Sequence, residues 1–537
     1  MNIVLTFSVG FSWYKQKGIS VKGYLFDSRN IFFEKENLIN YFADIYSVED
    51  FERKIRKANG CFAVVIKREN IVLASVDRLR SIPLFYSIIN DEIMLTDSVE
   101  EIKRKYNLNN FDPVSEAEYK CTGFVTHNKT LFNEVKQLQV GEYLYIKNNA
   151  LKTKYYYHHF ADCLNDNNRL DYFVKLEQIA GNVFKRLISS VKGRTIIIPL
   201  SAGLDSRFIV SMLRHLGYQK VICFTYGDPD GWEIKTSRQI ARKLGYDWHY
   251  VEYNKDLFGP SWKEDIINFG LFSSNFVSLP HVQDLYAVRE LKKRNVIPDE
   301  AVFVPGHTGD LISGKQITTE VKKVQANINL FNIAELISQK HYYLNSVMLD
   351  EFREKFVSRI SEYCAQSPSL FSNNIFNLLD AWNVANRQAK FILNSARVYE
   401  YLGHEWRLPL WDNELVDFFE SLPLSQRMNA SLYTDYLFKK VFPKFDITFY
   451  NRKQQIGNFI KRVAPSFYAA LIKTIGYNNI SSSKMYRALV ACIKDDSKEN
   501  HGKESNGIYF NHNFTPWFIK ELKNALKAKN KRVLHDD

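Results

Sequence analysis

Residues 195–207 hold the polar side chains best placed to do chemistry. The apolar, β-branched run from Thr195 to Leu200 predicts a short buried strand. The turn Ser-Ala-Gly-Leu-Asp-Ser follows at 201–206, and the next residues have helical apolar spacing up to Gly217. A helix that begins directly after a strand presents free N–H groups and the positive end of its dipole, and two serine hydroxyls add donors. The segment therefore predicts an anion site, and it differs from a Walker loop because no Gly-Lys-Ser/Thr follows.

This turn resembles the pyrophosphate-binding loop of ATP pyrophosphatases, whose usual form is Ser-Gly-Gly-Leu-Asp-Ser. The resemblance implies that the loop holds the β- and γ-phosphates of ATP, which is cleaved between its α- and β-phosphates to adenylate a substrate. The residues implied to bind ATP or pyrophosphate are Ser201, Ala202, Gly203, Leu204, Asp205, Ser206, Cys223, Thr225 and Gly306. Ala202 replaces a glycine of the loop, which is tolerable unless that position needs a positive φ. The alternative is an ordinary strand–turn–helix whose serines are caps.

Two aspartates are candidate ligands for Mg²⁺, which adenylation needs in order to neutralise the departing pyrophosphate. Magnesium prefers a few carboxylates together with phosphate oxygens. Asp205 lies in the turn itself, and Asp310 follows a predicted strand at 301–305. The segment Gly-His-Thr-Gly-Asp at 306–310 resembles the asparagine synthetase motif Ser-Gly-Glu-Gly-Ala-Asp-Glu, in which the first Asp helps to hold magnesium. The alternative is that Asp310 only stabilises its glycine-rich turn, through hydrogen bonds to the nearby backbone.

The same resemblance points to two catalytic residues, Lys453 and His307. Asn451-Arg-Lys resembles the Arg-x-Lys segment of asparagine synthetases, whose lysine contacts the α-phosphate. His307 stands where the family has an acidic residue beside the substrate and the incoming amine, and Leu311 replaces a second one. The acyl acceptor or the substrate is therefore expected to differ from aspartate. His307 is either a general base near neutral pH or a loop histidine that only forms hydrogen bonds.

The first 160 residues read as short strands and resemble the glutaminase domain of asparagine synthetases. Asn59-Gly-Cys-Phe-Ala and the segment 77–86, Asp-Arg-Leu-Arg-Ser-Ile-Pro-Leu-Phe-Tyr, carry the resemblance. It implies an N-terminal-nucleophile (Ntn-type) α+β sandwich. The family's activity requires a cysteine as residue one, whose α-amino group is the base for its thiol. Position 2 here is Asn2, and Cys61 lies inside a predicted strand, so we expect a degenerate domain that does not hydrolyse glutamine.

Strands must alternate with helices to position the turn at 201–206. A polar connector at 161–169 precedes an amphipathic helix, and predicted strands and helices then follow one another, which favours a doubly wound parallel sheet of the adenine-nucleotide α-hydrolase type. Ligands of such sheets lie beyond the carboxyl ends of the strands. The expected domains are 1–160, degenerate glutaminase; 170–460, ATP pyrophosphatase; and 461–537, a helical C-terminal extension. Thr515 is expected to cap the last helix, with Pro516 in its first turn.

Composition narrows the class of protein. The net charge is +13, but Lys and Arg are dispersed, so an anionic substrate explains it better than nucleic acid. The six cysteines form no close pairs, which indicates reduced thiols and a cytoplasmic protein. No apolar run is long enough to span a bilayer, and the first residues lack the basic region and cleavage site of a signal peptide.

The chain is thus expected to be a bacterial asparagine-synthetase-like amide ligase that uses ATP and Mg²⁺. Its partners would be a small-molecule or sugar-acid carboxylate and either ammonia or a substrate amine, in surface-polysaccharide or natural-product biosynthesis. Two alternatives stay open: a cyclase of the β-lactam synthetase or lasso-peptide type, and a non-catalytic scaffold that binds ATP. The oligomeric state cannot be deduced from the sequence.

Overall fold

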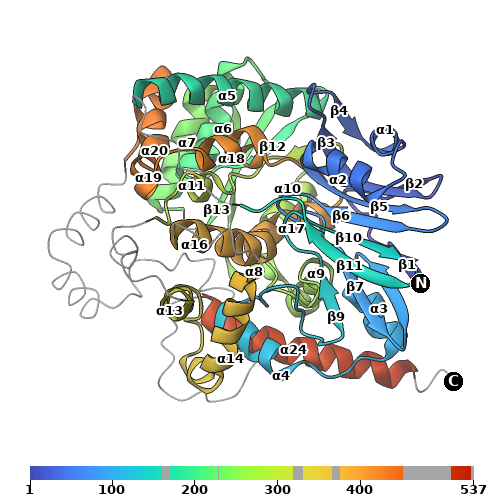
Figure 1. Ribbon diagram of the computed structural model, residues 1–537. Coiled ribbons are helices and arrows are strands. Elements are labelled where there is room, and N and C mark those ends of the chain that lie inside the picture. Colours follow the sequence, from blue (N-terminus) through green and yellow to red (C-terminus); the bar gives the residue numbers. More distant parts are fainter. Residues whose placement is uncertain (160–168, 228, 318–329, 366–374, 451–509, 534–537) are drawn as a thin grey trace.

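A computed structural model describes residues 1–159, 169–227, 229–317, 330–365, 375–450 and 510–533 (Figure 1). The N-terminal sandwich occupies one side of the molecule, and a five-stranded sheet with its helices occupies the other. Among these residues no helix combines the length and the apolar character that crossing a bilayer requires.

The N-terminal domain consists of two sheets. The seven-stranded sheet contains β2 (Tyr14–Gln16), β3 (Ile19–Phe26), β4 (Phe32–Glu34), β5 (Asn59–Lys67), β6 (Val72–Val76), β10 (Glu142–Lys147) and β11 (Ala150–Tyr155). The four-stranded sheet contains β1 (Asn2–Val4), β7 (Phe85–Ile89), β8 (Glu92–Thr96) and β9 (Val135–Gln137). The helices are α1 (Glu36–Tyr41), α2 (Val48–Arg56), α3 (Val99–Tyr106) and α4 (Pro113–Thr122). This confirms the expected α+β sandwich.

Strand β5 shows why the seven-stranded sheet is buried on both faces. Successive side chains of a strand point to opposite faces. Phe62 and Val64 belong to one apolar cluster, together with side chains of α1 and α2. Ala63 and Val65 belong to another, which includes side chains of β7 and β8 in the other sheet. The run of apolar residues in β5 is therefore explained by a layer on each side.

The second sheet is parallel throughout, in the order β14-β13-β12-β15-β16. Its strands are β12 (Ile196–Pro199), β13 (Val221–Gly227), β14 (Asp247–Glu252), β15 (Val302–Phe303) and β16 (Glu405–Trp406). Its flanking helices are α5 (Arg169–Val191), α6 (Leu204–His215), α7 (Trp232–Leu244), α8 (Lys255–Phe258), α9 (Trp262–Ser273), α10 (Leu285–Lys293) and α11 (Gly309–Ile312). The parallel α/β arrangement is the one expected, and the strands predicted at 195–200 and 301–305 are shorter than expected.

Helices dominate the rest of the described chain. They are α13 (Leu330–His341), α14 (Ser346–Ala365), α16 (Ile375–Asn383), the π-helix η2 (Val384–Ile392), η3 (Leu393–Ala396), α17 (Arg397–Tyr401), η4 (Pro409–Trp411), α18 (Asn413–Glu420), α19 (Leu424–Arg427), η5 (Met428–Ala430), α20 (Ser431–Tyr436), the π-helix η6 (Leu437–Val441), η7 (Phe442–Phe445) and α24 (Phe510–Val533). Helix α24 contacts α4 and α9, where Trp517 stacks on Trp262 with ring centroids 5.3 Å apart. The predicted cap was wrong: the helix begins at Phe510, and Pro516 lies inside it.

Buried charged side chains join the two parts of the chain, through an ion pair and a cation–π contact. The Lys22 ammonium lies 2.7 Å from the Glu400 carboxylate, and both side chains are almost fully buried. The Arg407 guanidinium covers the ring of Tyr24 at 4.2 Å from its centroid. The largest apolar cluster likewise includes residues of both parts, so the sandwich and the α/β unit share a core.

Candidate functional site

The loop between β12 and α6 lies at the carboxyl end of the parallel sheet, with the serines turned toward each other. The hydroxyl oxygens of Ser201 and Ser206 are 3.1 Å apart, and the Gly203 amide donates to the Ser201 hydroxyl at 3.0 Å. Gly203 is the N-cap of α6 and provides no side-chain cap, so the first N–H groups of the helix remain for a ligand. Ala202 is not in the left-handed region, which explains why alanine replaces glycine there without strain.

Two glycines let the loop after β15 approach the start of α6. A Cβ on Gly306 would lie 2.6 Å from the Ser206 amide nitrogen, and one on Gly309 would lie 2.6 Å from Asp205 Oδ1. A real Cβ tolerates neither distance. Gly306, predicted as a ligand-binding residue, is thus placed against the backbone of the phosphate loop.

The two predicted metal ligands meet at this contact. The Asp310 amide donates to Asp205 Oδ2 at 3.2 Å, and the Tyr433 hydroxyl donates to Asp205 Oδ1 at 2.9 Å. Burial, and next the charge of Asp310, raise the pKa of Asp205 to about 7. The Asp310 carboxylate is paired with the Lys315 ammonium at 3.0 Å. A carboxyl group whose pKa is raised by a neighbouring carboxylate is part of a donor set that a divalent cation would stabilise.

A pair of carboxylates is the protein contribution typical of a magnesium site, and it is too few ligands for a metal held by protein side chains alone. Within the described ranges, no group of three or more His, Cys, Asp or Glu side chains is arranged to hold a metal. Mg²⁺ usually keeps one or two carboxylates, several waters and substrate phosphate oxygens. Asp205 and Asp310 beside the uncapped N-terminus of α6 provide the protein's share of such a site.

Sequence reasoning did not identify Tyr433. It lies in α20, more than two hundred residues after the loop, in a stretch without a motif. Its side chain is buried, and burial raises its pKa well above the usual value, so the hydroxyl keeps its proton and acts as a donor. No pattern in the sequence connects it with Asp205, because only the packing of α20 against α6 brings the two together.

His307 lies next to Ser395, with Nε2 and Oγ 2.7 Å apart. Burial lowers its pKa to about 4, although Asp310 acts in the opposite direction. The imidazole is therefore neutral at pH 7 and a weak base, which favours the hydrogen-bonding interpretation over the general base near neutral pH.

Cys223 and Thr225 of β13 contribute no free side chain to the site. Cys223 is buried in the sheet between Ile198 and Trp248. The Thr225 hydroxyl donates to the Leu200 carbonyl at 2.6 Å. Any contact of β13 with a nucleotide would therefore have to come from its backbone.

Cations near the loop are few in the described part of the chain, and Lys453 lies outside it. The Arg207 guanidinium is engaged by backbone carbonyls: its Nη1 donates to Ile447 at 3.2 Å and to Phe449 at 3.1 Å, and its Nη2 donates to Ala202 in the loop. Arg387 of η2 is half-buried and forms no ion pair within the described ranges. Burial lowers its pKa, and the charges that oppose this belong to Tyr343 and Asp310, which places the guanidinium on the Asp310 side of the site.

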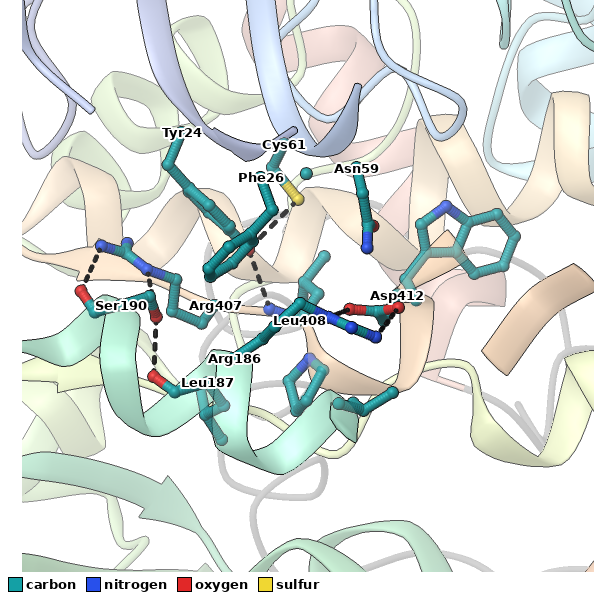
Figure 2. Close-up of a pocket in the computed structure, with 14 residues that line it drawn as sticks. Tyr24, Phe26, Asn59, Cys61, Arg186, Leu187, Ser190, Arg407, Leu408 and Asp412 are labelled. Carbon is teal, nitrogen blue, oxygen red and sulfur yellow. Dashed lines mark hydrogen bonds and ion pairs between the residues drawn. The ribbon is translucent and has the colours of Figure 1, made fainter. Parts of the chain in front are cut away.

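A pocket of about 30 Å³ lies where the sandwich meets the α/β unit (Figure 2). The Tyr24 hydroxyl lies 3.5 Å from Cys61 Sγ, and Arg186 makes a bidentate pair with Asp412 at 2.8 Å for each bond (Figure 2). Cys61 lies inside β5 as predicted, and burial raises the pKa of its thiol. Asn2 begins β1, opposite Met94. Neither position supplies an activated nucleophile.

Comparisons with known proteins agree with this domain order. A family model described as a glutamine amidotransferase domain matches residues 45–157, and one described as asparagine synthase matches 180–310. The microcin J25-processing protein McjC of Escherichia coli is 23% identical over 269 residues, covering 49% of this chain and 48% of that protein. Asparagine synthetase [glutamine-hydrolyzing] 1 of Bacillus subtilis (strain 168) is 25% identical over 203 residues, covering 36% of this chain and 31% of that protein.

The chain spans about half or less of the length of these two relatives. Among solved structures, the glutamine phosphoribosylpyrophosphate amidotransferase of B. subtilis with ADP and GMP matches 57% of this chain and 59% of that one, at 10% identity and a TM-score of 0.17. The two family models confirm the predicted resemblance, because a match to a glutamine amidotransferase domain precedes a match to asparagine synthase in the chain.

Proposed function

We propose that this asparagine-synthase-like chain activates a carboxylate with ATP and joins the acyl group to ammonia or to an amine. The observation that carries the proposal is the contact of Asp205 with Asp310 beside the uncapped N-terminus of α6. Phosphate groups favour such a helix end, and two carboxylates suit the metal that accompanies them. No phosphate-binding lysine of the Walker type is present in the loop, which favours pyrophosphate release over transfer of the γ-phosphate.

The proposed reaction has two steps. A carboxylate oxygen of the substrate attacks the α-phosphorus, the bond from that phosphorus to the bridging oxygen breaks, and pyrophosphate leaves. The amine nitrogen then attacks the acyl carbon, and the bond from this carbon to the oxygen that links it to phosphorus breaks. AMP leaves with that oxygen, and the nitrogen gives up a proton. The N–H groups of α6 and the hydroxyls of Ser201 and Ser206 would hold the pyrophosphate. Asp205 and Asp310 would hold Mg²⁺, which supplies positive charge for the leaving group.

Two further roles belong to the proposal. Lys453 would contact the α-phosphate and stabilise the charge that develops there. His307, neutral at pH 7 and bonded to Ser395, would orient the substrate or the amine through hydrogen bonds.

The amine is proposed not to come from glutamine in the same chain. Asn2 offers no thiol, and the Cys61 thiol is buried with a raised pKa. Ammonia or an amine of the substrate is therefore the proposed nucleophile. Surface-polysaccharide or natural-product biosynthesis in the bacterial cytoplasm is the proposed setting.

A peptide cyclase is the second candidate. More of this chain aligns with a microcin-processing protein than with an asparagine synthetase, 49% against 36%. In that case the carboxylate and the amine would belong to one peptide, and the second step would close a ring.

Exchange of labelled pyrophosphate into ATP, dependent on Mg²⁺ and on a carboxylate, tests the first step for both candidates. Products should be AMP and pyrophosphate, and glutamate should not be released from glutamine above a control without enzyme. ADP and phosphate as products would contradict the proposal. Exchange with peptide carboxylates alone would favour the cyclase, and its absence with every carboxylate tried would favour a non-catalytic ATP-binding scaffold.

A further inference from the structure

A small cavity lies at the contact between the N-terminal sandwich and the α/β unit. Arg80 and Ser81, in the loop between β6 and β7, line one side. Ser273 at the end of α9 and Arg397 at the start of α17 line the other. The cavity measures about 20 Å³, which is enough for one water molecule or one small ion.

Two buried guanidinium groups line this cavity with unpartnered N–H donors. Arg80 and Arg397 are each only 4% exposed. Arg80 donates its Nε to the Leu138 carbonyl at 3.1 Å, whereas its Nη2 has no hydrogen-bond partner in the part of the chain that the structure describes. Arg397 reaches Glu400 through Nη1 at 3.0 Å, but its Nε and Nη2 likewise have no described partner. Buried donors of this kind are almost always satisfied in folded proteins.

The carboxylates near the cavity are already engaged. Glu400 is shared between Arg397 and Lys22, which lies 2.7 Å from it. Asp77 accepts hydrogen bonds from the backbone amides of Phe62, Leu79 and Ser81. None of the described carboxylates comes within 4.0 Å of the Arg80 guanidinium.

Positive charge therefore exceeds negative charge around the cavity. Lys390 lines it as well, 2% exposed, and its Nζ donates to the carbonyls of Val125 and His127. Burial lowers the pKa of Lys390 well below its usual value, so the two guanidinium groups carry the positive charge at the cavity. Burial, and next the neighbouring Arg397, lower the pKa of Arg80 to about 9. Arg80 also has a φ of 57°, a left-handed conformation that a side-chain-bearing residue seldom adopts. The fold thus holds like charges close together at a domain contact.

We propose that this cavity binds one small monovalent anion, chloride being the expected ion, between Arg80 and Arg397. The anion would accept hydrogen bonds from Arg80 Nη2 and from Nε and Nη2 of Arg397, and it would supply the missing negative charge. Because the anion would contact both parts of the chain, its binding would stabilise their contact. The proposal does not depend on the amide-bond chemistry, and its test needs no substrate.

Thermal unfolding of the full chain tests the proposal, with sodium chloride replacing sodium gluconate at constant ionic strength. Chloride should raise the Tm by about 2–4 °C, and the rise should saturate as a binding site fills. Sodium bromide should act like chloride, and a crystal grown in bromide should give an anomalous peak between the two guanidinium groups. Equal Tm values in chloride and gluconate, or a water without a bromide peak, would overturn the proposal.

Two variants connect the effect with the cavity. Arg80→Met and Arg397→Met should each lose the chloride-dependent part of the Tm shift. Arg104→Met is the matched control, because that side chain is 74% exposed on α3, and it should keep the shift. Retention of the full shift in both cavity variants would also overturn the proposal. If either variant fails to fold, the chloride dependence of the wild-type Tm and the bromide peak test the proposal.

Discussion

Asp77 in the sandwich and Asp205 in the α/β unit are both carboxyl groups with a raised pKa, yet their surroundings differ. Asp77 directly follows β6 and is buried, whereas Asp205 lies in the first turn of α6 and is half-buried. Asp77 accepts hydrogen bonds from the amides of Phe62, Leu79 and Ser81 and from the Ser81 hydroxyl, all close in sequence or in the adjacent strand. Asp205 accepts two, from Tyr433 and the Asp310 amide, and faces a second carboxylate.

The two pKa values alone would not separate these residues. Burial raises the pKa of Asp77 to about 6, and burial with the charge of Asp310 raises that of Asp205 to about 7. The two carboxylates differ in the groups that surround them. A carboxylate saturated by its own loop holds the loop together, whereas a carboxylate opposed by another has oxygens left for a cation. We therefore propose that Asp77 serves the stability of its loop and that Asp205 serves the chemistry.

The largest expected effect is that of Asp205→Asn or Asp310→Asn on adenylation. Each removes one of two charges that would hold the metal and keeps the size of the side chain. We expect pyrophosphate exchange to fall a hundredfold or more, about 3 kcal/mol in the barrier. Wild-type exchange in both variants would show that the site is misassigned.

Asp205→Asn should not destabilise the fold. Because the folded-state pKa of Asp205 is raised above its usual value, its ionised form costs stability, and this cost grows as the pH rises from about 4 through about 7. At pH 8 the variant should therefore unfold at the same temperature as the wild type or higher. A clearly lower Tm at pH 8 would give Asp205 the structural role assigned to Asp77.

Asp77→Asn is the reciprocal test. Either orientation of the amide places an NH₂ against a backbone amide of Phe62, Leu79 or Ser81, so at least one buried donor loses its acceptor. We expect the free energy of unfolding to fall by about 2 kcal/mol, measured by urea denaturation. Pyrophosphate exchange per folded molecule should stay at the wild-type rate.

Gly306→Ala should disturb the contact that brings the two carboxylates together. Its Cβ would lie 2.6 Å from the Ser206 amide, so the two loops must separate. We expect exchange to slow by about tenfold, in line with overpacking costs of 1–3 kcal/mol. Gly181→Ala in α5 is the control, because a Cβ there meets no atom within 4 Å. It should raise stability by up to about 1 kcal/mol and leave exchange unchanged.

The smallest expected effect is that of Tyr433→Phe. The loss of its hydrogen bond to Asp205 removes a contact that lowers the pKa of this carboxyl, so that pKa should rise further. We expect exchange at pH 7 to fall severalfold, about 1 kcal/mol, and to recover partly at higher pH. Tyr436→Phe, in the same helix but without a hydrogen bond to Asp205, should have no such effect. Equal pH profiles for the two variants would remove Tyr433 from the site.

The sequence by itself determined the local framework of the site. The apolar run at 195–200 became β12, the turn at 201–206 leads into α6, and Asp310 follows β15. These features depend on residue type and on neighbours in the chain, which is why they can be predicted. The alternation of strands and helices then required a parallel sheet, and a parallel sheet places both aspartates at the same edge.

Only the tertiary structure decided what surrounds those aspartates. Tyr433 reaches Asp205 because α20 packs against α6. The pKa of His307 is lowered because the side chain is partly withdrawn from solvent beside Ser395. Arg80 meets Arg397 more than three hundred residues away only because the two parts of the chain share a core. Burial and long-range contact set the charge and the partners of a side chain, and neither quantity is a property of the residue or of its sequence neighbours.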